Sequence, residues 1–249
     1  MRWWSYTLIG LFGYLVFMMA NIPARQALGW LESANLPVTL QEISGTVWSG
    51  RAGQTIYKNN GLGAADWSFE PLGLLRGKLE YRVALRDQGQ ELKGRIAGSP
   101  LGDKIQLHDV TGLVDLNILL KILEQSYVNA RGRLDLDLHE VEFTTDRLVY
   151  ADGQIHWLEA GLNSPIPLEL GGLQFDLSTQ GEKVSARIKD LKGPVKIAAD
   201  LDLQPDGQYL IKGQIKQEGA ENQSISGLLR TVGKPLPDGS IQVDYKGQL

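Results

Sequence analysis

The first strong pattern along the chain is an uninterrupted apolar run near its beginning. Residues 3–20, WWSYTLIGLFGYLVFMMA, carry no charge and lie between Arg2 and Arg25. As an α-helix this run would extend roughly 27 Å, which is close to the ~30 Å hydrocarbon core of a bilayer. Pro23 follows, and no second stretch of similar length and apolarity occurs later. The sequence therefore predicts at most one membrane-spanning helix.

The apolar run has two interpretations, a retained anchor or a cleaved signal peptide. A signal peptide typically has several positive charges, an apolar stretch of roughly 7–15 residues, and small residues at positions −3 and −1 of the cleavage site. Here only Arg2 precedes a longer run, and cleavage after Ala20 would place Met18 at −3. We favour an uncleaved single-pass anchor within residues 1–22, with a cytoplasmic start and the rest of the chain beyond the membrane.

The period of the pattern changes twice after the apolar run. Within residues 23–36, apolar side chains at Ala24, Ala27, Leu28 and Leu31 have helical spacing, which predicts a short juxtamembrane helix or linker. From residue 37 to residue 249 the period is mostly two, as in strands with one buried and one solvated face. The sequence therefore predicts one β-rich domain over 37–249.

The alternation is clearest in several runs separated by turn residues. The apolar members of these runs are Leu79, Tyr81, Val83 and Leu85; Leu134, Leu136 and Leu138; Val184, Ala186 and Ile188; Val195, Ile197, Ala199, Leu201 and Leu203; and Ile241, Val243 and Tyr245. Turns are predicted at Asp87-Gln88-Gly89, Asp152-Gly153, Gln180-Gly181, Pro205-Asp206-Gly207 and Pro237-Asp238-Gly239. Short strands joined by such turns predict an antiparallel meander.

Two later stretches have helical rather than alternating spacing. Val114 to Leu123 places its leucines on one face, with Asp115 positioned to cap the first turn, and Asn222 to Val232 has a similar pattern. Short helices cannot cover so many half-buried strands, so the sheet must curve over itself. The predicted fold is mainly β: a single N-terminal transmembrane helix, then a curved antiparallel β-meander, taco-like or sandwich, with two or three short helices.

Composition narrows the possible partners. The chain has 25 Lys and Arg against 29 Asp and Glu, a net charge of −4, and no cysteine. A mildly acidic, mixed surface does not favour nucleic-acid binding. Without cysteine the chain forms no disulfide and no thiolate metal site.

Candidate chemistry is sparse. Asp135, Asp137 and His139 lie on one face of one predicted strand, as ligands of a divalent ion would, but charged residues opposite leucines are also typical of a solvated strand face. Gly61-Leu62-Gly63 lacks the third glycine and the helix of a dinucleotide site, and no nucleophile elbow is present. We expect no enzyme activity, no catalytic residue, no metal site and no cofactor.

Two motifs carry a family resemblance. ISGTVWSGRA at Ile43 to Ala52, followed by WSFEPLGLLRGKLEYRV at Trp67 to Val83, resembles the protein N family of the type II secretion system, also called the general secretion pathway. ARGRLDLDL at Ala130 to Leu138 is shared more widely with AsmA-like envelope proteins. The motif positions, with a structural or partner-contact role, are Gly45, Thr46, Val47, Trp48, Ser49, Gly50, Trp67, Pro71 and Gly77.

The resemblance implies a location and a function. It implies a protein of the inner membrane of a Gram-negative bacterium, with most of its chain in the periplasm, that contacts other secretion-system components. In that family such proteins act in export of folded proteins across the outer membrane and are not enzymes. The alternative is an AsmA-like envelope protein that binds lipid or another apolar ligand in a β-groove.

These two hypotheses differ in whether the inner apolar face is closed by its own side chains. The strand from Val195 to Leu203 has the longest unbroken alternation, and Tyr209, Ile211 and Ile215 follow on the next predicted strand as packing partners. We therefore expect the face to be closed, with lipid as a possible ligand if it is open.

Overall fold

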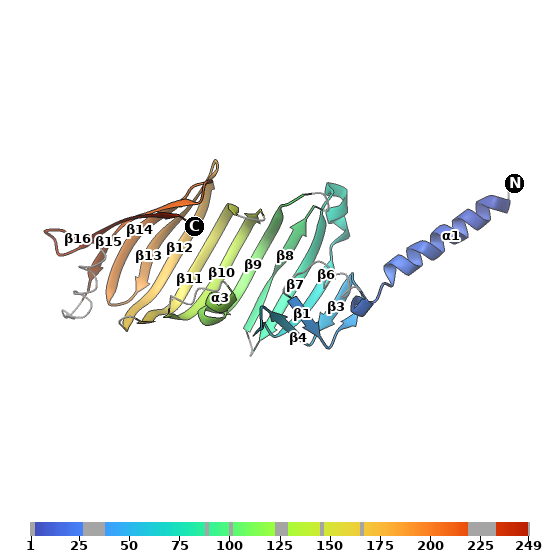
Figure 1. The fold of residues 1–249 in the computed structure, drawn as a ribbon, viewed down its shortest axis with the longest axis horizontal. Coiled ribbons are helices and arrows are strands. Elements are labelled where there is room, and N and C mark those ends of the chain that lie inside the picture. Colours follow the sequence, from blue (N-terminus) through green and yellow to red (C-terminus); the bar gives the residue numbers. More distant parts are fainter. Residues whose placement is uncertain are drawn as a thin grey trace.

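A computed structural model describes residues 3–26, 38–87, 90–99, 102–122, 129–144, 147–164, 167–218 and 233–248. Within these ranges the protein is mainly β, and every strand pairing is antiparallel, as the alternation predicts. Figure 1 shows one long, twisted sheet with a helix extending from one end. The prediction of a mainly β meander is therefore confirmed.

Fourteen strands form the main sheet, in the order β16-β17-β15-β14-β13-β12-β11-β10-β9-β8-β7-β6-β3-β2. Their bounds are β2 Ser44–Gly45, β3 Ser49–Ala52, β6 Ala64–Phe69, β7 Leu79–Asp87, β8 Gln90–Gly98, β9 Ile105–Asp115, β10 Asn129–Phe143, β11 Leu148–Ser164, β12 Leu168–Gln180, β13 Lys183–Lys192, β14 Val195–Leu203, β15 Gln208–Gln217, β16 Lys234–Pro235 and β17 Ile241–Gln248. A small second sheet has the order β1-β4-β5, with β1 Val38–Gln41, β4 Gln54–Tyr57 and β5 Asn60–Gly61. Neighbours in the main sheet follow chain order closely, so these fourteen strands form one continuous sheet and not the two packed sheets of a sandwich.

One predicted turn lies inside a strand. Gly153 is within β11, with φ +139°, and it faces Leu138 where β10 carries a one-residue register shift. A Cβ at this glycine would lie 2.5 Å from the carbonyl oxygen of Asp137. The Asp152-Gly153 prediction is therefore wrong as a turn, because the glycine accommodates a β-bulge and a close strand approach instead.

A continuous row of apolar residues and glycines crosses the main sheet. Directly paired residues lie on the same face, so pairing register alone defines this row. Its members come from β3, from each strand between β6 and β15, and from β17: Ala52, Ala65, Leu85, Leu92, Gly112, Leu136, Ile155, Phe175, Ile188, Ala199, Gly213 and Val243. At about 4.8 Å between strands the row extends roughly 50 Å along the sheet. We call it the apolar row.

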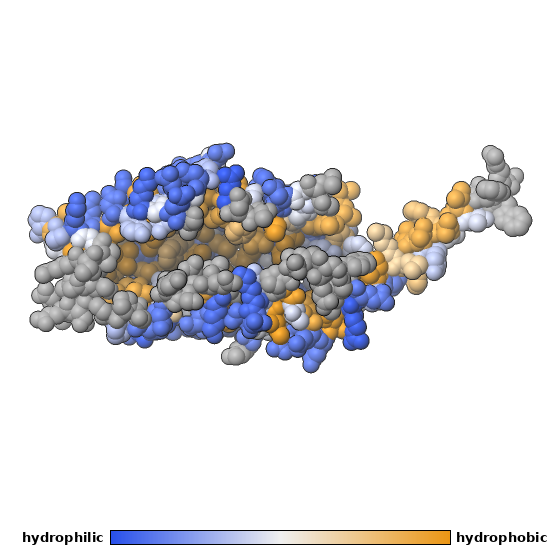
Figure 2. Space-filling view, in the orientation of Figure 1, coloured by the Kyte–Doolittle hydropathy of each residue, from blue (hydrophilic) through white to orange (hydrophobic). Residues whose placement is uncertain are grey.

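The face that carries the apolar row is hollowed. Figure 2 shows an apolar floor between two more hydrophilic rims, along the long axis of the sheet. The sheet curls enough that Leu168 of β12 packs with Ile241 of β17, although three strands separate them. Yet only Val195, 1% exposed, is a large side chain buried below 2% among the described residues. Among the described residues the face is therefore only partly covered. The expected closure stays a prediction, because part of the packing it relies on, the helix predicted over 222–232, lies outside those residues.

A short helix, α3 Leu116–Ile122, covers part of this face. It follows β9 directly, and the carboxylate of Asp115 accepts a hydrogen bond from the backbone N–H of Asn117 at 2.7 Å. Leu116 packs with Ala130 and Leu134 of β10. The helix predicted within Val114 to Leu123 is thus confirmed, with its first two residues in β9. The helix predicted over 222–232 lies outside the described residues.

The N-terminal helix, α1 Trp3–Ala20, forms over the whole apolar run. Its large side chains from Tyr6 to Met19 are exposed, each by about half or more. Within the described part of the chain, no helix combines the length and the apolarity needed to cross a membrane. The predicted membrane span therefore stays a prediction. Ala24 to Gln26 are helical, but most of the predicted juxtamembrane segment lies outside the described residues.

Candidate functional site

The end of α1 is held against the sheet by the segment between β2 and β3. The indole Nε1 of Trp48 donates a hydrogen bond to the carbonyl oxygen of Met19 at 2.7 Å. The backbone N–H of Val47 donates to the carbonyl oxygen of Ile22 at 3.0 Å. Since the last carbonyls of a helix have no partner within it, Trp48 caps α1. We call this region, Met19–Pro23 with residues 44–50, the helix junction.

The motif GTVWSG forms the tight connection at the helix junction. The backbone N–H of Thr46 donates to the carbonyl oxygen of Ser49 at 2.8 Å, and the N–H of Ser49 donates to Thr46 Oγ1 at 3.1 Å. Gly45 has φ +89°, and a Cβ there would lie 2.5 Å from the carbonyl oxygen of Ser49. The backbone conformation therefore requires a glycine at this first position of the motif.

Aromatic rings extend the helix junction into the sheet. The rings of Trp48 and Phe69 are 4.9 Å apart, and those of Phe69 and Tyr81 are 5.3 Å apart. Trp67 Nε1 donates to the carbonyl oxygen of Thr46 at 3.1 Å. A Cβ at Gly50 would lie 2.4 Å from the Trp67 ring, so the second motif glycine admits that ring. The two tryptophans therefore pack within the helix junction, and their indole N–H groups bind backbone carbonyl oxygens there.

The remaining motif positions bound a connection between β6 and β7. This connection contains the 3₁₀ helix η1, Pro71–Arg76, with Pro71 as its first residue. Gly77 caps it with φ +71°, and its N–H points to the carbonyl oxygens of Gly73 and Leu74. The structure therefore gathers the motif positions at one end of the sheet: Gly45 to Gly50 and Trp67 at the helix junction, Pro71 and Gly77 at the ends of η1.

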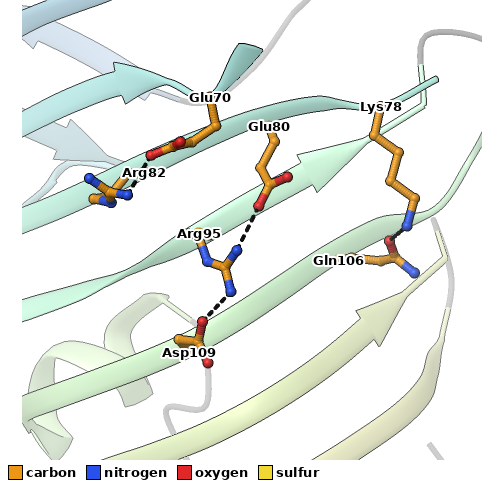
Figure 3. Close-up of polar contacts among 7 residues, drawn as sticks. All are labelled: Glu70, Lys78, Glu80, Arg82, Arg95, Gln106 and Asp109. Carbon is orange, nitrogen blue, oxygen red and sulfur yellow. Dashed lines mark hydrogen bonds and ion pairs between the residues drawn. The ribbon is translucent and has the colours of Figure 1, made fainter. Parts of the chain in front are cut away.

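The face of the sheet opposite the apolar row is polar and carries many ion pairs. We call it the polar face. Figure 3 shows Arg95 between Glu80, at 3.1 Å, and Asp109. The hydrogen bond that the Arg95 guanidinium donates to the carboxylate of Asp109 is the main reason that the pKa of Arg95 is raised. Glu142 accepts hydrogen bonds from Lys104 and Gln106, both at 2.6 Å. The Lys104 bond is the largest cause of the lowered pKa of Glu142. These ion pairs and hydrogen bonds connect side chains of different strands on the polar face.

The candidate metal ligands lie on this polar face. Asp135, Asp137 and His139 are exposed along β10, and His139 Nδ1 lies 3.1 Å from Asp152 Oδ2 on β11. Among the described residues no three His, Asp or Glu side chains are grouped to hold a metal ion.

The apolar face contains a cavity beneath α3. It has a volume of about 190 Å³. Leucines dominate its lining, among them Leu62, Leu85, Leu92, Leu119, Leu134 and Leu136. Three of these belong to the apolar row, so the cavity is one deep part of the hollowed face and not a separate site.

The family model described as "Type II secretion system (T2SS), protein N" matches residues 37–244. The chain belongs to this family. It is 27% identical over 237 residues to type II secretion system protein N of Vibrio cholerae serotype O1, covering 93% of each chain. No solved structure matches it.

Two further relatives have similar coverage. Type II secretion system protein N of Aeromonas hydrophila is 25% identical, over 96% of each chain. The protein of the same name from Klebsiella pneumoniae is 26% identical, over 94% of this chain and 92% of that one. The family resemblance inferred from the motifs is thereby confirmed.

Sequence reasoning missed the contact between Trp48 and Met19. These residues are 29 positions apart, and no local pattern relates them. The only available signal was an aromatic side chain inside a glycine-bounded motif, which pointed to packing and not to a helix cap.

Proposed function

We propose that this protein is an inner-membrane component of the type II secretion machinery of a Gram-negative bacterium and acts through protein–protein contacts. The main observation that supports this proposal is the family match across residues 37–244. In this proposal residues 1–22 are the cytoplasmic stub and anchor, residues 23–36 the juxtamembrane segment, and residues 37–249 the periplasmic domain. The protein is not an enzyme and uses no cofactor.

The anchor has independent physical support. Large apolar side chains of α1, such as Phe12 at 71% and Ile9 at 67%, are exposed to solvent. At roughly 25 cal/mol per Å², leaving such surface in water is unfavourable, and a bilayer would remove it. The eighteen helical residues extend about 27 Å, slightly less than the ~30 Å hydrocarbon core, so in this proposal local bilayer thinning or the flanking residues would make up the difference.

Membrane extraction tests the anchor. Full-length protein should stay with membranes after washing at alkaline pH, and a reporter active only outside the cytoplasm should work when fused after Leu249. Release of the protein by the alkaline wash, or an amino terminus that maps to residues 20–25, would contradict retention of α1.

Secretion and crosslinking test the function. A strain that lacks the protein should retain exported enzymes in the periplasm, and wild-type protein should restore their release. Photo-crosslinkers placed at exposed motif positions, Ser49 and Pro71, should capture another secretion-system component. A matched crosslinker at exposed Lys93 of β8 controls for random capture. Normal secretion without the protein would refute the proposal.

A second candidate function is binding of lipid acyl chains in the hollowed face. The supporting observation is the apolar row, most of whose large side chains are only half-buried although they face the hollow. An open apolar surface of this length is unusual for a protein without an apolar ligand or partner. Phospholipid is the favoured ligand because the proposed anchor would hold the sheet beside a bilayer.

Neighbouring residues of β11 provide a matched test of lipid binding. Ile155 belongs to the apolar row, whereas Gln154 is exposed on the polar face. Native mass spectrometry of purified protein should detect a phospholipid, and Ile155→Asp should reduce its amount while Gln154→Asp should not. Circular dichroism should show that both variants stay folded. Equal lipid content in the two variants would argue against this ligand.

A further inference from the structure

The connection between β6 and β7 exposes three leucines at once. Leu72, Leu74 and Leu75 of η1 are 67%, 53% and 85% exposed. Most of a six-residue helix is thus apolar surface presented to solvent. Single exposed leucines need no explanation, but three on one short projecting element indicate a contact surface.

Contacts of Gly73 and of the residues that flank η1 fix the orientation of this helix on the sheet. Gly73 is buried against Glu80, where a Cβ would lie 2.8 Å from the Glu80 Cβ. The backbone N–H of Glu70 donates to the carbonyl oxygen of Glu80 at 2.8 Å, and the N–H of Lys78 donates to that of Gly73 at 3.1 Å. Arg95 holds the Glu80 carboxylate in turn (Figure 3). The small residue therefore faces the sheet and the large ones face outward.

The position of η1 relates it to α1. Phe69, the last residue of β6, lies beside Trp48, which caps α1, and its N–H donates to the Trp48 carbonyl oxygen at 2.6 Å. η1 begins two residues later. In Figure 1 both α1 and η1 lie at the same end of the sheet. A short, hydrogen-bonded path therefore connects the end of the proposed anchor with the exposed leucines.

The charge beside the leucines is positive. Arg76, in the last turn of η1, is exposed and forms no ion pair with another described residue. The nearby acids are occupied: Glu70 pairs with Arg82 at 2.5 Å and Glu80 with Arg95. Leucines flanked by an unpaired arginine fit the boundary between acyl chains and anionic headgroups.

We propose that η1 is a second membrane contact, whose leucines enter the surface of the same bilayer that holds α1. The inference rests on the proposed anchoring of α1 and extends it. Two attachments would fix the tilt of the sheet relative to the bilayer more firmly than the anchor alone. They also bring Leu79, which is 39% exposed at the start of β7, close to the bilayer. In this arrangement the end of the apolar face that is nearest to η1 would lie at the membrane surface.

Site-directed spin labelling of the full-length protein tests this contact. The chain has no cysteine, so single cysteines can be labelled without background. We would place nitroxides by Leu75→Cys, Phe12→Cys or Leu191→Cys and reconstitute each protein in vesicles of phosphatidylethanolamine and phosphatidylglycerol. Power saturation would compare collisions with oxygen, which concentrates in lipid, and with a water-soluble nickel complex. Leu191 of β13, 48% exposed, is the matched control.

The three labels separate the possible results. The inference expects the Leu75 and Phe12 labels to favour oxygen and the Leu191 label to favour nickel. If Phe12 favours oxygen but Leu75 behaves like Leu191, the anchor stands and the inference fails, leaving a protein as the partner of these leucines. If Phe12 and Leu75 both favour nickel, the anchor and the inference fail together. Because Leu75 is 85% exposed, its replacement does not disturb the core.

Discussion

Replacing Trp48 with phenylalanine would test how α1 is held against the sheet. Trp48→Phe keeps a ring next to Phe69 but removes the indole N–H that bonds the Met19 carbonyl oxygen at 2.7 Å. We expect α1 to become more mobile relative to the sheet. The strands themselves should remain intact, because no pairing within the main sheet depends on that N–H.

The size of the effect follows from the bond that is lost. A typical hydrogen bond contributes about 1 kcal/mol net, and an unsatisfied carbonyl costs about 1–3 kcal/mol when it is away from water. Met19 is near the C-terminus of α1, where the helix dipole is negative and favours a donor. A loss of about 1 kcal/mol corresponds to a roughly fivefold lower ratio of docked to undocked helix.

Pulsed electron paramagnetic resonance can measure this ratio. Nitroxides introduced by Phe12→Cys in α1 and Lys93→Cys in β8 would report the distance between helix and sheet. The distribution should be narrow in the otherwise unchanged protein and broader with Trp48→Phe. Trp157→Phe is the matched control, because Trp157 Nε1 also donates to a carbonyl oxygen, that of Arg131 at 3.0 Å, away from the helix junction.

Two results would refute this reasoning. If Trp48→Phe leaves the distance distribution unchanged, the hydrogen bond does not hold the helix. If Trp157→Phe broadens the distribution equally, the effect comes from general loosening of the sheet and not from the helix junction.

Three further changes test the packing and electrostatics. Gly50→Ala should lower the melting temperature and alter Trp67 fluorescence, because its Cβ would lie 2.4 Å from the Trp67 ring; unchanged stability would contradict that packing. Glu142 has a lowered pKa in the folded protein, so its stabilising contribution, present above the unfolded pKa, is lost as pH falls through the folded pKa. Urea titrations at several pH values should show a smaller acid dependence for Glu142→Gln than for the wild type. Leu201→Ala should cost less than about 2 kcal/mol in a urea titration, because an open face leaves no closed cavity; a larger loss would indicate closure.

The sequence by itself determined most local structure. An uncharged run of residues predicted α1, alternation predicted β7 and β14, and the spacing of Leu116, Leu119 and Leu120 predicted α3. These features depend on neighbours within a few positions, which is the range over which periodicity carries information. The family motif also identified, without any structure, the residues that gather at one end of the sheet.

Long-range arrangement was decided by the tertiary structure. The hydrogen bond from Trp48 to Met19 and the bulge at Gly153 depend on where distant segments meet. The sequence predicted an apolar strand face but not what lies opposite, since the same alternation suits a closed sandwich and an open, curled sheet. Twist and register, summed over many strand pairs, decided that the apolar row lines a hollow. That is a property of the sheet as a whole, because each pair alone contributes only a small rotation.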